Sequence, residues 1–158
     1  MDKLVTVLWF DGDAQEAARF YTSTFPDSHM GHTAAAPSDY SDGKAGDPIT
    51  VNFTLLGRRF SGLNGGLQFK PNESVSFMVL TDDQAETDRY WDAIVGNGGQ
   101  ESDCGWCKDK WGFSWQITPR TLIAALEAGG DEAKRAFDAM MTMQKIDVAA
   151  IDAARKGN

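Results

Sequence analysis

Histidine and cysteine are scarce in this chain, with two of each among 158 residues. His29 and His32 are three residues apart in a segment of strand-forming residues, so their side chains are expected to point to opposite faces. Cys104 and Cys107 form a single C-x-x-C pair, and a zinc site would need further ligands from a distant segment. We therefore expect both thiols to be reduced and structural, because free cysteine packs as a small apolar residue.

Positive charge and long apolar runs are also lacking. The formal net charge is −8, and an acidic surface repels phosphate backbones and anionic lipids. The apolar stretch from Leu4 to Phe10 is too short for a membrane span, and Asp11 follows it too soon for a signal peptide. We expect a cytoplasmic protein that binds neither nucleic acid nor membranes.

The glycine-rich turn G-x-G-x-x-G does not occur in the chain. This turn is the usual means by which Rossmann-like enzymes hold a nucleotide or S-adenosylmethionine. Gly65 and Gly66 precede the run from Leu67 to Phe69 rather than a helical pattern, which predicts a hairpin turn. No cofactor is expected.

The chain repeats one pattern at a spacing of 70 residues. A strand-forming segment precedes Asp13 and Glu16, and another precedes Asp83 and Glu86, each pair matching the cap of a helix. Two apolar stripes at helical spacing follow, namely Ala17, Phe20, Tyr21, Thr24 and Phe25, then Thr87, Tyr90, Trp91, Ile94 and Val95. A cap and a stripe that recur at one spacing indicate an internal duplication.

Further strands are predicted at residues 30–35, 49–56 and 59–64 in the first copy, and at 100–106 and 113–118 in the second. The polar segment 37–48 reads as a long loop. Beyond Pro119 three helices are predicted, the second capped by Asp131 and the third by Asp147. In the strand 113–118, Ser114 and Gln116 share one face, and a glutamine there either lines a cavity or bonds within a core.

Four segments resemble the PhnB-like family of the vicinal oxygen chelate superfamily, also called 3-demethylubiquinone-9 3-methyltransferase-like. They are Trp9 to Tyr21, Asn64-Gly-Gly66, Asp109 to Pro119 and Met140 to Ala150. The resemblance implies one α+β domain over residues 1–158, in which two βαβββ modules, about 3–66 and 73–118, form a half-open β barrel. A helical tail at about 119–156 follows, and the fold is of the glyoxalase and bleomycin-resistance type.

The resemblance also implies the positions of a site. In metal-bearing relatives four strands supply His, Gln or Glu ligands, and the matching positions here are Thr6, Leu63 or Asn64, Ser76 and Gln116. Because Gln116 alone keeps a ligand type, no metal is expected. The candidate ligand-binding residues are Thr6, Leu8, Asn64, Ser76, Met78, Trp106, Ser114 and Gln116, with Lys108 and Trp111 near the mouth.

These observations favour metal-independent binding of a small, partly apolar molecule in the barrel cavity. The first alternative is a 3-demethylubiquinone-9 3-methyltransferase-like enzyme, as the family label implies. The second is a metal-dependent enzyme of the glyoxalase or dioxygenase type. No nucleophile and base can be paired from the sequence, so no catalytic residue is assigned. The resemblance further implies a homodimer, because half-open barrels leave sheet edges that copies of the fold commonly pair.

Overall fold

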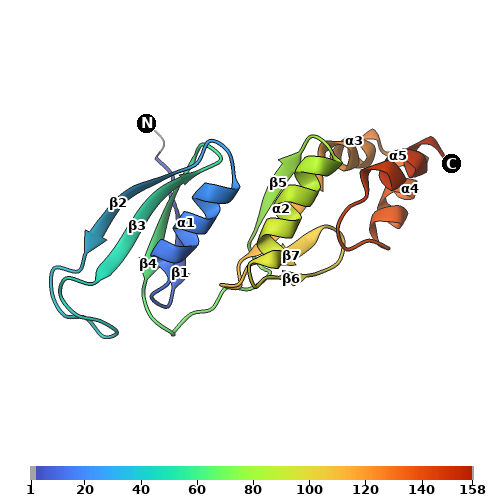
Figure 1. The fold of residues 1–158 in the computed structure, drawn as a ribbon. Coiled ribbons are helices and arrows are strands. Elements are labelled where there is room, and N and C mark those ends of the chain that lie inside the picture. Colours follow the sequence, from blue (N-terminus) through green and yellow to red (C-terminus); the bar gives the residue numbers. More distant parts are fainter. Residues whose placement is uncertain (1–2, 158) are drawn as a thin grey trace. The chain divides into compact units, whose positions relative to one another are not determined.

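The computed structural model describes residues 3–157, and it divides into two compact units with the boundary between Lys70 and Pro71. Each unit contains a four-stranded mixed sheet, and one face of each sheet carries a helix (Figure 1). The chain therefore has the α+β class that the sequence predicts, with one βαβββ module in each unit.

Within residues 3–70, the first module consists of β1 (Thr6–Phe10), α1 (Ala14–Thr24), β2 (His29–Ala35), β3 (Pro48–Leu55) and β4 (Arg58–Asn64). The strand order is β1-β4-β3-β2. Strand β1 runs parallel to β4, and the other two pairs are antiparallel. The parallel pair forms because α1 carries the chain back across the sheet before β2.

Helix α1 lies very close to its sheet. The residues it buries are small or aromatic, namely Ala14, Ala17, Ala18 and Tyr21. A Cβ atom at Gly62 of β4 would lie only 2.9 Å from the Cβ of Ala14, so glycine is needed for this approach. The helix therefore turns its alanines toward the sheet, and only part of the predicted stripe is buried.

The second module begins with β5 (Ser76–Thr81) and α2 (Gln84–Gly96), followed by β6 (Gln100–Glu101), β7 (Trp106–Lys108) and β8 (Ser114–Pro119). Its strand order is β5-β8-β7-β6, with β5 parallel to β8. The single strand expected at 100–106 was wrong, because the segment is a hairpin of β6 and β7. Cys104 and Gly105 turn the chain there, with φ angles of 59° and 82°.

Helix α2 confirms its predicted cap and stripe. The carboxylate of Asp83 accepts a hydrogen bond from the backbone N–H of Glu86 at 2.8 Å, which satisfies one free donor of the first turn. The helix buries Thr87, Tyr90, Trp91 and Ile94. Its core therefore follows directly from the periodic pattern.

Three helices follow the second module, as predicted: α3 (Arg120–Ala128), α4 (Gly130–Met140) and α5 (Val148–Lys156). Asp147 caps α5 by accepting from Ala150 N at 2.9 Å. Asp131 is not a cap, because α4 begins one residue earlier, after Gly129. Between 3 and 157, no helix is long and apolar enough to cross a membrane.

Candidate functional site

The stretch from Asp109 to Phe113 is built around a buried carboxylate. Asp109 is 4% exposed. Its Oδ1 accepts from the backbone N–H groups of Trp111 and Phe113, both at 3.0 Å, and its Oδ2 accepts from Trp115 Nε1 at 2.9 Å. The sequence predicts a turn here but does not reveal this role of the aspartate. The carboxylate fixes how β8 starts, and so sets which face its side chains occupy.

Five of the predicted site residues lie on the face of the second sheet that points away from α2. Paired residues on neighbouring strands share a face. Ser76 pairs with Ser114, and Met78 pairs with Gln116. Trp106 also pairs with Gln116 and Lys108 with Ser114. We call this surface the Gln116 face; it consists of Ser76, Met78, Trp106, Lys108, Ser114 and Gln116.

The polar groups of the Gln116 face are only partly paired with one another. Gln116 Nε2 donates to Ser76 Oγ at 2.8 Å. Ser114 is 1% exposed, and its Oγ has no hydrogen-bond partner within the described part of the chain. A buried hydroxyl without a partner costs about 1–3 kcal/mol. The face therefore contains a buried polar group that a bound molecule would satisfy once the side chains covering it move aside.

An ion pair and an exposed apolar side chain complete the Gln116 face. Lys108 Nζ pairs with the carboxylate of Glu73, in the turn before β5. The hydrogen bond from Lys108 lowers the pKa of Glu73. Met78 is 50% exposed although it lies in the middle of β5. Charge, hydrogen-bonding groups and apolar surface thus occur together within the second unit.

The first module places its predicted site residues differently. Leu8 pairs with Gly62, and a Cβ atom at Gly62 would point toward α1. The side chain of Leu8 therefore also faces the helix, and it is 5% exposed. Thr6 shares this face, because alternate residues of a strand do. The residues of β1 that point away from α1 are Val7 and Trp9. The geometry therefore puts Thr6 and Leu8 on the side of the sheet opposite to that expected.

The cause is a one-residue difference between the two copies. Ser61 corresponds to Ser114, and they pair with Val7 and Ser76 respectively. Val7 is thus the counterpart of Ser76, and the strands are offset by 69 residues (76 − 7). The helices are offset by 70, as Asp13 and Asp83 show. A shift of one residue moves every side chain of a strand to its other face.

Asn64 serves the structure of its own module. It is 7% exposed. Its Oδ1 accepts from the backbone N–H of Ala14 at 2.9 Å, and its Nδ2 donates to the carbonyl of Pro48 at 2.8 Å. Asp13, the predicted cap of α1, makes no side-chain capping bond. Asn64 on β4 therefore caps α1 from across the module, which leaves its amide committed.

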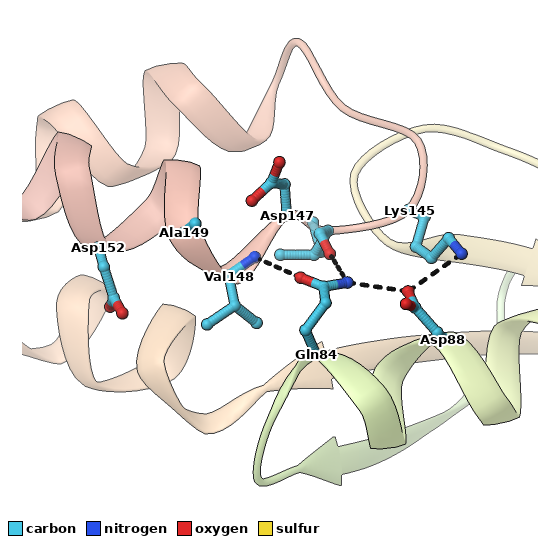
Figure 2. A pocket seen from close by; sticks show the side chains of 8 residues that line it. Gln84, Asp88, Lys145, Asp147, Val148, Ala149 and Asp152 are labelled. Carbon is cyan, nitrogen blue, oxygen red and sulfur yellow. Dashed lines mark hydrogen bonds and ion pairs between the residues drawn. The ribbon is translucent and has the colours of Figure 1, made fainter.

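A separate cavity of about 570 Å³ lies beside the first turn of α2 (Figure 2). Gln84 occupies its wall and makes three hydrogen bonds. Its Oε1 accepts from Val148 N at 2.8 Å, and its Nε2 donates to Asp88 Oδ1 at 2.9 Å and to the carbonyl of Ile146 at 3.1 Å. These bonds attach α5 and the segment before it to α2.

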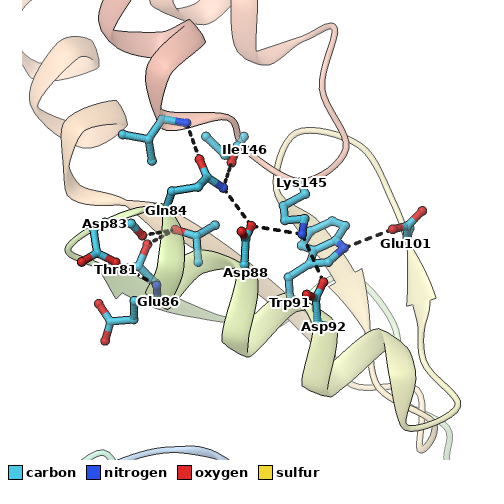
Figure 3. A network of polar contacts seen from close by, with 12 residues as sticks. Thr81, Asp83, Gln84, Glu86, Asp88, Trp91, Asp92, Glu101, Lys145 and Ile146 are labelled. Carbon is cyan, nitrogen blue, oxygen red and sulfur yellow. Dashed lines mark hydrogen bonds and ion pairs between the residues drawn. The ribbon is translucent and has the colours of Figure 1, made fainter.

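Ion pairs strengthen the same junction (Figure 3). Lys145 Nζ lies 3.0 Å from Asp88 Oδ1 and 3.1 Å from Asp92 Oδ1. Hydrogen bonds from Gln84 and Lys145 lower the pKa of Asp88. Burial alone would lower the pKa of Lys145, but its bonds to the two aspartates raise it. The polar side chains of Gln84, Asp88 and Lys145 that line the cavity are paired with one another. Their bonds hold the C-terminal segment against α2.

The residues present do not fit a metal site of the kind that the fold family implies. On the Gln116 face, the two positions at which the resemblance implies metal ligands hold a serine and a glutamine, and the glutamine amide donates to the serine. His29 and His32 are both exposed on β2. Among residues 3–157, no three His, Cys, Asp or Glu side chains gather where they could hold a metal ion.

The two cysteines are free thiols with different surroundings. Burial, and then the negative charges of Asp109 and Glu101, raise the pKa of Cys107 to about 12. Cys104 lies in the β6–β7 turn and is less buried. We expect one fast-reacting thiol with DTNB at neutral pH, because the thiolate is the reactive form, and a second only after unfolding.

The variant Cys104→Ser is the control for this thiol count and should remove the fast phase entirely. Cys107→Ser should leave the fast phase unchanged. Two fast thiols in the folded wild type would contradict the assignment of Cys107 as the buried, slow thiol. A disulfide that persists under reducing conditions, which would leave no fast thiol, would also contradict it.

Comparison with known proteins agrees with the architecture. The model of a family described as 3-demethylubiquinone-9 3-methyltransferase matches residues 2–118, so α3, α4 and α5 lie beyond the match. No curated protein matches the chain significantly. The PhnB protein from Bacillus cereus is 29% identical over 75% of this chain and 99% of that one, with a TM-score of 0.64.

Two further solved structures share the fold at lower identity. Protein PA1353 from Pseudomonas aeruginosa is 16% identical over 75% of this chain and 98% of that one, with a TM-score of 0.61. The fosfomycin resistance protein FosX from Listeria monocytogenes is 17% identical over 79% of this chain and 96% of that one, with a TM-score of 0.53. The chain therefore belongs to the PhnB-like family, whose model is described as 3-demethylubiquinone-9 3-methyltransferase.

Proposed function

We propose that the Gln116 face binds a small, partly apolar molecule without the help of a metal ion. The observation that carries this proposal is the hydroxyl of Ser114, which is buried and has no hydrogen-bond partner within residues 3–157. Stable cores pair their buried polar groups. The unpaired hydroxyl of Ser114, on the same face as the half-exposed Met78, is a group to which a bound molecule can add a hydrogen bond.

The neighbouring side chains supply the rest of such a site. The Nε2 of Gln116 is held by Ser76, which orients the amide and leaves its oxygen to accept a hydrogen bond. Trp106 and Met78 flank Gln116 on either side and offer a ring and a flexible thioether to an apolar body. A few fixed polar groups within apolar walls are the usual composition of a small-molecule site.

Donor chemistry supports the metal-free form of the proposal. A divalent ion is removed from water by carboxylate, imidazole or thiolate donors. The Gln116 face offers hydroxyls, one amide and the cationic Lys108, and the carboxylate nearest to them, Glu73, is paired with that lysine.

A methyltransferase, as the family description suggests, needs a place for a methyl donor. Gly65 and Gly66 do not supply the glycine turn of a nucleotide site, because a turn rather than a helix follows them. Their backbone groups instead join β1: Gly65 N donates to the carbonyl of Phe10 at 2.9 Å, and the carbonyl of Gly66 accepts from Trp9 Nε1 at 2.8 Å. These contacts give Gly65 and Gly66 a structural role, so they offer no support for a methyl-donor site here.

The homodimer stays part of the proposal. Strands β1 and β5 each form one edge of their sheet, and edge strands are surfaces on which copies of a chain commonly pair. The apolar side chains of Val7 and Met78 on these strands are 58% and 50% exposed.

The proposal predicts that Gln116→Leu weakens the binding of naphthol, an apolar probe with one hydroxyl, by about ten-fold. The substitution removes one hydrogen bond of about 1.4 kcal/mol to the probe. Backbone amide shifts in a nuclear magnetic resonance titration should locate the probe on β5, β7 and β8. The exposed Gln68 provides the matched control, since Gln68→Leu should leave the affinity unchanged.

A second arm addresses the metal. Elemental analysis of protein purified without chelator should find no stoichiometric metal. Titration with naphthol should give the same affinity with and without EDTA. One zinc, nickel or iron per chain whose removal abolishes binding would overturn the metal-free proposal. Naphthol shifts confined to the Gln84 cavity would move the site to that junction.

A further inference from the structure

We propose that the molecule bound by the Gln116 face carries a carboxylate, and that Glu73 occupies the place of this group in the free protein. The inference rests on the proposed function and adds the chemical class of the ligand. It would make the Gln116 face selective for small apolar acids, and it gives Glu73 the role of an internal competitor.

The geometry that points to this is a row of residues across three strands. Ser76 of β5 pairs with Ser114 of β8, and Ser114 pairs with Lys108 of β7. Lys108 also reaches the carboxylate of Glu73, three residues before Ser76. The ion pair therefore connects β7 with the segment before β5, on either side of β8 and close to Ser114. The carboxylate of Glu73 already lies beside the positive charge of Lys108.

The ion pair is suited to exchange its anion. The side chains of Lys108 and Glu73 are 35% and 60% exposed, and an ion pair so accessible to water contributes little to stability. Glu73 stays charged through neutral pH, because the hydrogen bond from Lys108 lowers its pKa. An incoming carboxylate would replace one charge by an equal one, and Glu73 would return to solvent.

The incoming group would gain a contact that Glu73 does not make. Glu73 is paired with Lys108, while the neighbouring Ser114 hydroxyl lacks a partner among the described residues. A carboxylate has two oxygens and about four acceptor positions, so it can accept from Lys108 and from Ser114 together. The apolar part of the molecule would then extend over the next row, where Met78 and Trp106 flank Gln116.

The test compares benzoate, which carries the charge, with benzamide, which has the same shape without it. Binding is followed by the amide shifts of β5, β7 and β8. In Glu73→Gln, we expect benzoate to bind about five-fold tighter because a competing charge of modest strength is removed. Benzamide should change by less than about two-fold, since its amide does not compete for a charge.

Three further variants make the outcome specific. Lys108→Met should abolish the preference for benzoate over benzamide, and Ser114→Ala should weaken benzoate in the Glu73→Gln background. Lys134→Met, which removes the exposed ion pair to Asp138 on α4, is the matched control and should leave both affinities unchanged. Thermal unfolding of each variant confirms that it is folded.

The results separate this inference from the function on which it rests. Equal affinities for benzoate and benzamide, unaffected by Glu73→Gln, would overturn the carboxylate inference and leave binding of a small molecule on the Gln116 face intact. No shift on β5, β7 or β8 with either probe or with naphthol would overturn both.

Discussion

Asp109→Ala will lower the free energy of unfolding by about 4 kcal/mol or more, because hydrogen bonds to a charged acceptor contribute about 1.5–3 kcal/mol each. Its carboxylate accepts three hydrogen bonds, from two backbone N–H groups and the indole of Trp115. Removing the acceptor leaves these donors without their partner at the start of β8. Urea unfolding followed by tryptophan fluorescence and by circular dichroism measures the loss.

Asp103 is the matched control, since it is an exposed aspartate in the turn of the same sheet. Asp103→Ala should change the stability by less than about 0.5 kcal/mol, as is usual at exposed positions. Asp109→Asn should fall between the two, because it keeps the shape and one acceptor oxygen but directs an amide N–H₂ at a donor. A loss below about 1 kcal/mol in Asp109→Ala would mean that the turn is held by other contacts.

Asn64→Ala has the second large expected effect, a loss of about 2–4 kcal/mol. The cap of α1 contributes about 1 kcal/mol, and leaving the carbonyl of Pro48 without its donor costs about 1–3 kcal/mol more. Both bonds are made by one side chain that is 7% exposed. The measurement is again urea unfolding, with circular dichroism reporting the helix.

The exposed Asn52 of β3 is the control for this substitution, and Asn52→Ala should have little effect. Asn64→Asp keeps an acceptor for Ala14 but places an oxygen against the carbonyl of Pro48, so it should recover only the capping part. If Asn64→Ala were no more destabilising than Asn52→Ala, the assigned role of Asn64 would have to be abandoned.

The sequence was sufficient where a pattern is periodic and local. The stripe of α2 was predicted correctly because Thr87, Tyr90 and Ile94 recur with a helical period. The alternation of β8 was predicted correctly because Ser114 and Gln116 alternate with large apolar residues. The segment from Leu4 to Phe10 has no such alternation. The helix offset of 70 residues predicts faces for β1 that are wrong by one residue, so Thr6 and Leu8 lie on the side of the sheet opposite to that expected.

Side-chain bonds between distant segments were the other part that the sequence did not reveal. Asp109 reaches Trp115 across a turn, and Asn64 reaches Ala14 from 50 residues away. Polar residues of these types are common in turns and at strand ends, so nothing in the composition distinguishes the two that are buried. Their partners become apparent only when the strands are in register.

The different caps of α1 and α2 also bear on the order in which the modules form. The cap of α2 comes from Asp83, three residues before Glu86, so this helix can close its first turn within its own segment. That of α1 comes from Asn64, and a loop of 50 residues must close before it is in place. Contacts so distant in sequence form late. On a growing chain, α1 therefore waits uncapped until the whole first module has been synthesised, whereas the cap of α2 can form as soon as that helix emerges.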